Sequence, residues 1–228
     1  MRKTLAILAI TGSFSAAAFA ADREIKVDDR LDASADTLID MMHAADKGIP
    51  KDLIEKAKCV VVLPGMKKAG FIFGAEYGRG FAVCRGHESS GWSAPAAMRA
   101  EGGSFGFQIG GQETDVFMLI MNERGMNRLF ATKFTLGGDA SVAAGPVGRS
   151  TQAETDAAMT AEILTWSRAR GLFAGISLSG ATLREDEDWN HDMYGRKISN
   201  KEVITGDVAP PAIAQNFMGM LNKYSSRK

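Results

Sequence analysis

Hydrophobic positions at the start of the chain recur with a helical period. Between residues 22 and 47 the apolar residues fall on one face and acidic residues lie between them, which predicts an amphipathic helix. Its apolar positions are Leu31, Ala35, Leu38 and Met42. Gly48 suits the end of this helix. Pro50 favours the first turn of a second, short helix that reaches Lys58. Both helices could pack on a sheet, which we favour because the first is acidic, or lie on a membrane surface.

From Cys59 onward the pattern changes to short apolar runs and alternation with period two, which is typical of strands. Gly78 separates two of the runs as a predicted tight turn, and residues 123–130 are predicted to form a short helical connection. The predicted strands are 59–63, 69–77, 79–85, 103–109, 114–121 and a further one near 134–144.

The last third of the chain returns to helical signals. Thr151 and Glu154 have the spacing of a capping box, which predicts a helix to about Arg170. Residues 172–183 alternate as a strand. Ser199-Asn-Lys-Glu202 is predicted to cap a short turn. Pro210-Pro211 predicts the start of a final helix, whose apolar face consists of Ile213, Phe217, Leu221 and Tyr224.

Glycine changes this picture, because 17 of the 25 glycines lie between Gly65 and Gly148, in and between the predicted strands. Glycine weakens a strand interior unless it marks a bulge, a bend or a close backbone approach. We therefore expect an α+β fold with a strongly curved, mainly antiparallel, barrel-like sheet. Helices near 31–57, 151–170 and 211–224 are expected to cover it.

The first residues have the pattern of an export signal. Arg2 and Lys3 precede an apolar stretch, and Ala18-Phe19-Ala20 fits a cleavage site, so we expect residues 1–20 to be a signal peptide cut after Ala20. Residues 21–228 are then expected to form one domain with an N-terminal helical segment. The expected location is a bacterial periplasm, with peripheral attachment to a membrane.

Charge and cysteine content narrow the class of protein. Without the signal, 25 basic residues stand against 27 acidic ones, a net charge of about −2, which argues against a general nucleic-acid binder. Cys59 and Cys84 each lie in a predicted strand, and export permits a disulfide between them. Two separate buried thiols are the alternative. Metal binding by cysteine is disfavoured, because no second ligand pair is present.

Recognisable catalytic motifs are weak in this sequence. Gly102-Gly-Ser104-Phe-Gly106 matches the pattern of a nucleophilic serine. That motif requires a helix after the serine, but the glycine-rich residues after Ser104 are poor helix formers. The alternation from Asp186 to Asp192 resembles a calcium loop, yet Lys197 occupies the position that needs a glutamate. No phosphate-binding or dinucleotide loop occurs. We expect a protein that is not an enzyme and has no cofactor or metal.

The basic residues are better candidates for a binding site. Lys67 and Lys68 are predicted in an exposed turn, beside the apolar Met66 and Phe71. A strand is flanked by Arg79 and Arg85, and Arg149 precedes a predicted helix N-terminus, a setting that favours phosphate.

The same residues carry a resemblance to a known family. The segment from Pro64 to Gly80 resembles the opening of the SYLF lipid-binding domain, and six further segments continue the resemblance in order over about residues 35 to 205. They are Gly91–Pro95, Gly102–Gly110, Gln112–Val116, Lys133–Gly137, Ala140–Arg149 and Ser167–Gly175.

The resemblance implies a phospholipid-binding module, since eukaryotic relatives bind phosphoinositides and, in some cases, actin. An exported bacterial chain would meet neither, so we expect anionic phospholipid such as phosphatidylglycerol or cardiolipin as the partner. The expected lipid-binding residues are Lys67, Lys68, Arg79, Arg85 and Arg149. Two alternatives stay open, namely a structural or interaction protein that binds another envelope protein, and a hydrolase that uses Ser104.

Overall fold

The computed structural model describes residues 13–44, 48–70, 73–86, 91–105, 110–146, 160–169, 172–175 and 178–225. Its helices and strands follow in chain order: α1 (Ser13–His43), α2 (Lys51–Lys56), β1 (Cys59–Gly70), β2 (Phe73–Cys84), β3 (Ala96–Phe105), β4 (Gly110–Ile120), α3 (Glu123–Leu129), β5 (Lys133–Thr135), β6 (Val142–Ala144), β7 (Ile163–Ala169), β8 (Leu172–Gly175), β9 (Thr182–Glu185), α5 (Glu187–Tyr194), α6 (Asn200–Thr205), the 3-10 turn η2 (Ala212–Ala214) and α7 (Gln215–Tyr224).

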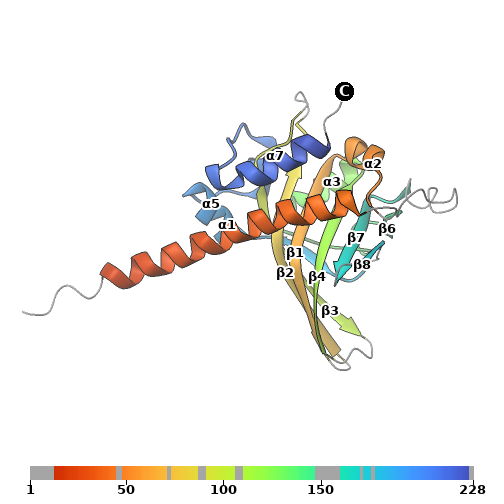
Figure 1. Cartoon of the computed structure of the whole chain (residues 1–228), viewed down its shortest axis with the longest axis horizontal. Coiled ribbons are helices and arrows are strands. Elements are labelled where there is room, and N and C mark those ends of the chain that lie inside the picture. The colour runs from red at the N-terminus through yellow and green to blue at the C-terminus, as the bar shows by residue number, and fades with distance from the viewer. Residues whose placement is uncertain are drawn as a thin grey trace, which may run out of the picture.

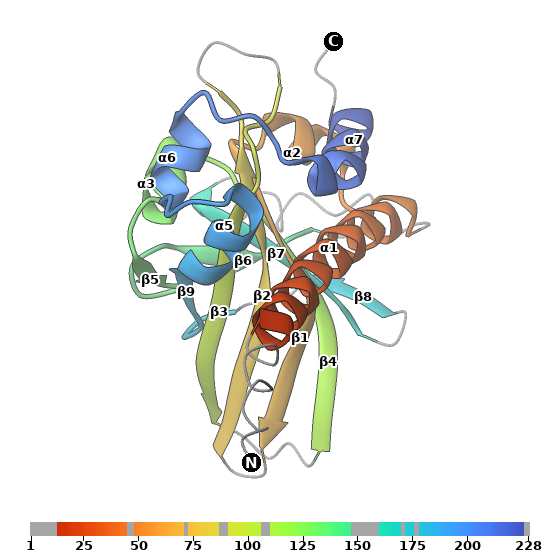
Figure 2. The same cartoon turned by 90° about the vertical axis from the view of Figure 1, so that its left-hand side faces the viewer.

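The described strands join in one curled sheet with the order β5-β9-β3-β2-β1-β4-β7-β6, and β8 pairs with β7. The pairings are antiparallel except that of β6 with β7. Helices lie against the sheet at the end where β1 begins and β2 finishes (Figures 1 and 2). The expected α+β class with a curved, mainly antiparallel sheet is therefore confirmed.

Strand β1 lies at the centre of the sheet and is buried on both faces over Cys59–Leu63. On one face Val60 and Val62 pack in a core with α1, α5 and α7. On the other face Val61 and Leu63 pack in a second core with α3, α6 and the strands β5 and β9. A continuous apolar run without alternation is what a strand covered on both faces requires.

A bulge bends β1 and its neighbours just beyond this buried segment. The pairing of β1 shifts register between Val62 and Lys67, and Gly65 has the left-handed φ of 57° that glycine adopts readily. On β2 a Cβ at Gly80 would lie 1.8 Å from the carbonyl oxygen of Val62, so the two backbones approach too closely for any side chain there. Glycines at these two positions thus mark a bulge and a close approach, as their clustering predicts.

Several expected boundaries are wrong. The chain does not turn at Gly78 but continues through it in β2, just as β1 continues through Lys67 and Lys68. A helix was expected from Thr151 to about Arg170. Residues 151–159, which include the capping box, lie outside the described residues, and Ile163–Ala169 form the strand β7 instead of a helix. Residues 172–183 form no single strand, since β8 and β9 are separate.

Other expectations are confirmed. Helix α3 occupies the expected connection, with the Asn122 side chain accepting a hydrogen bond from the Gly125 N–H. Helix α6 begins after Ser199, whose hydroxyl accepts a bond from the Glu202 N–H. The final helix α7 follows Pro211 through one 3-10 turn.

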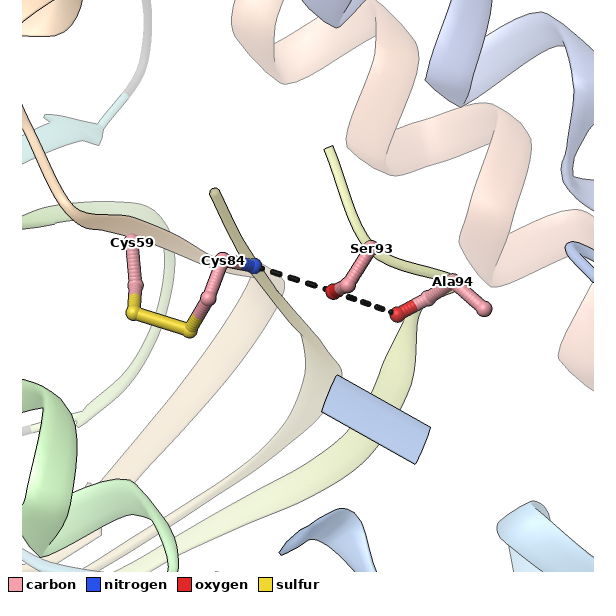
Figure 3. Close-up of a disulfide and its surroundings, with 4 residues drawn as sticks. All are labelled: Cys59, Cys84, Ser93 and Ala94. Carbon is pink, nitrogen blue, oxygen red and sulfur yellow. Dashed lines mark hydrogen bonds between the residues drawn. A yellow bond between two sulfur atoms is a disulfide. The ribbon is translucent and has the colours of Figure 1, made fainter. Parts of the chain in front are cut away.

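Cys59 and Cys84 form a disulfide between the adjacent strands β1 and β2 (Figure 3). They are direct register partners, and both are fully buried. The backbone N–H of Cys84 also donates to the Ser93 hydroxyl at 3.1 Å. The bridge therefore fixes the helix-covered end of the sheet.

The opposite ends of β1 to β4 extend well away from the helices (Figures 1 and 2). We call this part the arm, and it comprises residues 67–70, 73–77, 101–105 and 110–114. Its register pairs small residues across the strands, with Gly70 opposite both Gly74 and Gly110. Strand β9 reaches only Glu101 of β3, and β7 reaches only Asp115 of β4.

Helix α1 runs along one face of the sheet, and its N-terminal part extends beyond it (Figure 1). The helix continues through Ala20, where cleavage is expected, and Val27 is the first of its described side chains in the core. Within the part of the chain that the structure describes, no helix combines the length and hydrophobicity needed to cross a bilayer.

Candidate anion-binding surface

Lys67 and Lys68 lie in the arm, inside β1 rather than in a turn. The side chain of Lys67 is exposed, and its register partners are Tyr77 of β2 and Glu113 of β4. Lys68 is opposite Glu76 and Gln112. Each lysine therefore has an acidic residue directly across from it, which the sequence did not reveal.

Arg79 lies one alternation further along β2, on the same face as Tyr77. Its Nε is 2.7 Å from Oδ2 of the buried Asp186, and its guanidinium carbon is 4.6 Å from the centre of the Trp189 ring. Only 26% of its side chain is exposed. Arg79 thus connects the sheet to the start of α5.

Arg85 does not lie with Lys67 and Arg79. Arg85 is 8% exposed and donates to the Ser225 carbonyl at 2.7 Å. Arg85 directly follows the end of β2. With a rise of about 3.3 Å per residue, it lies roughly 26 Å from Tyr77 along the strand. Met66, expected as an apolar contact, is fully buried. Arg149 and Phe71 lie outside the described residues.

The register brings together a row of cations across four strands, which we call the basic row. Arg79 of β2 is opposite Arg99 of β3, Arg99 is opposite Arg184 of β9, and Arg184 is opposite Lys133 of β5. Directly paired residues share a face, so the row spans about 14 Å at the usual strand spacing. Like charges in direct opposition destabilise a sheet unless anions lie between them.

Acidic side chains within the protein partly neutralise the row. Glu101 bridges two of its members, with Oε1 at 3.0 Å from Arg99 Nε and Oε2 at 3.1 Å from Arg184 Nη1. Arg184 remains 40% exposed, and Lys133 is exposed. A cleft of about 260 Å³ opens beside the row, lined by both arginines and by Thr132, Glu185, Glu187 and Asp188.

Two carboxyl groups near the row have shifted pKa values. Burial raises the pKa of Asp186, and the Arg79 guanidinium partly opposes this change. Burial likewise raises the pKa of Glu185, and the hydrogen bond from the Asn200 N–H partly opposes it. The Glu185 carboxylate accepts hydrogen bonds from Asn190 and Asn200, which also bond to the backbone of Ala97, so it helps to hold α5 and α6 against β3.

The other motifs find structural roles. Asp186 is the N-cap of α5, where its carboxylate accepts a bond from the Trp189 N–H, so the acidic alternation belongs to a helix start. Ser104 lies near the end of β3, and the next described element is the strand β4 rather than a helix. Among the described residues no cluster of three or more metal-ligating side chains is present.

Sequence reasoning missed Arg99, Arg184 and Lys133 because strand register decides which residues meet. A local signal existed in the alternation Arg99-Ala-Glu101, which is typical of a strand with one polar face. For α5, Asp186 and Gly195 were usable start and stop signals, since Gly195 has the left-handed φ of 66°.

The fold and this surface define a class: an α+β module with one curved sheet that gathers cations from four strands on one face. Residues 101–224 match the family model described as "Ysc84: Las17-binding protein actin regulator". The chain belongs to this Ysc84 family, which is the SYLF domain family that its motifs resemble.

Curated relatives agree with this assignment. An SH3 domain-containing protein of Schizosaccharomyces pombe is 38% identical over 182 residues, 78% of this chain and 42% of the relative. The SH3 domain-containing YSC84-like protein 1 of Rattus norvegicus is 36% identical over 193 residues, 84% of this chain and 56% of the relative. LAS seventeen-binding protein 3 of Saccharomyces cerevisiae is 35% identical over 174 residues, 75% of this chain and 37% of the relative. The chain thus spans about half the length of the curated relatives it matches.

Proposed function

We propose that this chain is a non-enzymatic module that binds anionic phospholipid through the sheet face carrying the basic row and Lys67. The family is consistent with lipid binding or with binding to actin regulators. The observation that carries the lipid proposal is the opposition of Arg79, Arg99, Arg184 and Lys133 on one face. Such a row costs stability in the isolated protein, and a negatively charged surface would offset that cost.

The energy scale is sufficient for reversible attachment. A basic residue close to an anionic membrane contributes about 1 kcal/mol, and the effect falls off within a Debye length. Arg184 and Lys133 are the more exposed members and would make the first contacts. Glu101 would keep the guanidinium groups of Arg99 and Arg184 in place before lipid arrives, because it pairs with both.

The arm extends the same face and would approach the bilayer together with the row. Lys67 lies on this face, whereas Lys68 occupies the next position along the strand and so the other face. At the last described pairing of β2 with β3, the register places Phe73 opposite Phe105. We propose that this end of the arm reaches the interface, where aromatic residues are favoured.

We place this activity at an envelope membrane after cleavage behind Ala20. Cleavage there would leave intact the part of α1 from Val27 onward, which packs in the core. The export pattern of residues 1–20 supports this location.

A protein partner is the second candidate, and the family description and the name of the yeast relative favour it. Such a partner could pair with the edge of β3 between Gly102 and Phe105, because among the described strands β9 pairs with this edge only as far as Glu101. An experiment can distinguish the two candidates, because lipid binding should be seen with vesicles and the purified protein alone, whereas protein binding needs the partner protein.

Sedimentation with liposomes tests the proposal. Purified protein should sediment with phosphatidylcholine vesicles that contain phosphatidylglycerol or cardiolipin, and much less with pure phosphatidylcholine. Raising the salt concentration should release it. Arg99→Gln/Arg184→Gln should weaken binding by about tenfold or more.

The matched control removes the same charge elsewhere. Lys51→Gln/Lys56→Gln also lowers the charge by two, but on the exposed side of α2. If both double variants lose affinity equally, net charge rather than the basic row is responsible. Equal sedimentation with neutral vesicles, or none with either kind, would refute lipid binding by this surface.

A further inference from the structure

A second, larger cleft lies at the other end of the sheet, beside the end of β2. Its volume is about 640 Å³, within the range of roughly 300–1,000 Å³ that is usual for small-molecule sites. Its walls come from three regions, namely the end of β2 with the start of the following segment, helix α3, and the segment after α6. The lining residues used below are Arg85, Trp92, Met126, Ile204, Val208 and Ala209.

Arg85 places a fixed cation in this cleft. The Arg85 side chain donates to the Ser225 carbonyl at 2.7 Å, and its guanidinium carbon is 4.2 Å from the centre of the Trp92 ring. The indole N–H of Trp92 donates to the Ser225 hydroxyl at 2.7 Å. One residue at the end of α7 therefore orients both the cation and the aromatic ring.

The backbone beneath the cation is equally well held. The Arg85 N–H donates to the Lys58 carbonyl at 2.8 Å, directly beside the disulfide of Cys59 and Cys84. The Ser93 N–H donates to the Cys84 carbonyl at 2.7 Å, and Figure 3 shows Ser93 in position against Cys84. A side chain that is already held in place loses little conformational entropy when it binds an anion.

The rest of the cleft is mixed: polar residues such as Ser93 and Thr205 line it together with apolar side chains. Met126 and Ile204 are at most 7% exposed, and Val208 is half-buried. Asp207 lies at the exposed rim and would repel an anion weakly, since solvent screens it. A cation at one point and an apolar wall beside it fit a molecule with an anionic head and one hydrocarbon chain.

We propose that this cleft binds a single-chain anionic amphiphile. A carboxylate or phosphate head would pair with Arg85, and the chain would lie against Met126, Ile204 and Val208. The site is separate from the surface proposed for membranes, because Arg85 is roughly 20 Å along β2 from Arg79, the nearest member of the basic row. The proposal does not depend on the function proposed above.

Tryptophan fluorescence provides a local readout. Trp166 and Trp189 are buried in the core, while Trp92 is partly exposed and lines the cleft. Decanoate and decyl phosphate, titrated as monomers, should change the emission in a saturable way, and Trp92→Phe should abolish the change. Decanol and inorganic phosphate should bind at least about tenfold more weakly, because each lacks one half of the recognition.

The two anionic probes distinguish the sources of the head group: a fatty acid predicts tighter decanoate binding, and a lysophospholipid predicts tighter decyl phosphate binding. Decanol binding as tightly as decanoate would overturn the role of Arg85. A signal that persists in Trp92→Phe, or no saturable signal with either anion, would overturn the site itself.

Two variants test the cleft by different means. Arg85→Gln should weaken binding by roughly tenfold or more. Because Arg85 is buried and its loss could unfold the protein, Ala209→Phe fills the cleft from an exposed position, and Ala174→Phe adds the same volume to an exposed position on β8. Ala209→Phe should lose decanoate binding while keeping the melting temperature and the vesicle binding of the parent. Equal decanoate affinity in both phenylalanine variants would contradict the proposal.

Discussion

The same four strands build two regions with opposite properties. At the helix-covered end, β1 is buried on both faces, and large side chains such as Phe81 and Phe117 fill one of the two cores. In the arm the strands continue with glycine at register positions and with exposed residues such as Lys67 and Tyr77. Side-chain burial therefore stabilises the first region, while the arm depends on strand pairing that the first region anchors. Substitutions should cost stability in the first and function in the second.

The sharpest test of this contrast compares two aromatic residues on one face of β2. Phe81 is fully buried, with its ring centre 5.8 Å from that of Trp189, whereas Tyr77 is 47% exposed. Phe81→Ala should lower the free energy of unfolding by about 3–5 kcal/mol, because it leaves a cavity. Tyr77→Ala should cost less than about 1 kcal/mol. Chemical denaturation measures both, and similar losses would refute the contrast.

The disulfide is the next largest contribution to the helix-covered end. Cys59 and Cys84 close a loop with a sequence separation of 25. Cys59→Ala/Cys84→Ala should lower the free energy of unfolding by about 3 kcal/mol, chiefly by relaxing the unfolded chain. Reduction of the parent protein should lower its melting temperature in the same direction. A double variant as stable as the parent would show that strand packing alone holds this end.

In the arm the expected effect is on binding. Lys67→Gln should weaken sedimentation with anionic vesicles by about fivefold, whereas Lys68→Gln, on the other face, should change it much less. The unfolding free energy should change by less than about 0.5 kcal/mol, because Lys67 is exposed. Glutamine is preferable to glutamate here, since Glu113 and Glu76 lie directly opposite and a reversed charge would strain the sheet. Unchanged vesicle affinity in Lys67→Gln would remove this lysine from the membrane contact.

The smallest effect concerns pH and Asp186. Its pKa is raised in the folded protein, so the folded state holds the proton more tightly than the unfolded one. This contribution to stability should fall as the pH rises from the unfolded value near 3.8 through the raised folded value. Asp186→Asn keeps an N-cap for α5 and should lack this fall. Denaturation curves for both proteins across that window measure the difference, and parallel pH profiles would contradict the shift.

The sequence predicted the fold class and the elements with local signals. Asn122 and Ser199 cap α3 and α6, and Pro211 precedes the final helix, because caps and prolines act within a few residues. For Cys59 and Cys84 the sequence left two possibilities open, a disulfide or two separate buried thiols. The disulfide forms because β1 and β2 are neighbouring strands whose register puts the two cysteines opposite each other.

The arm and the basic row were not predictable in the same way. Lys67 and Lys68 were expected in a turn, whereas the sheet absorbs the irregularity before them as a bulge within one long strand. The run Ile163–Trp166 is buried on both faces and so has no period to separate strand from helix. Arg99 and Arg184 meet only through the register of β3 with β9, which joins residues far apart in the chain.

Hydrogen exchange in the presence of vesicles tests the central claim most directly. With phosphatidylcholine vesicles that contain phosphatidylglycerol, amide protection should rise over residues 97–105 and 182–185, which carry Arg99 and Arg184. Protection at 204–210, beside the cleft at the other end of the sheet, should not change. Protection confined to 204–210, or unchanged exchange at 97–105 and 182–185 while the protein sediments with the vesicles, would contradict membrane binding through the basic row.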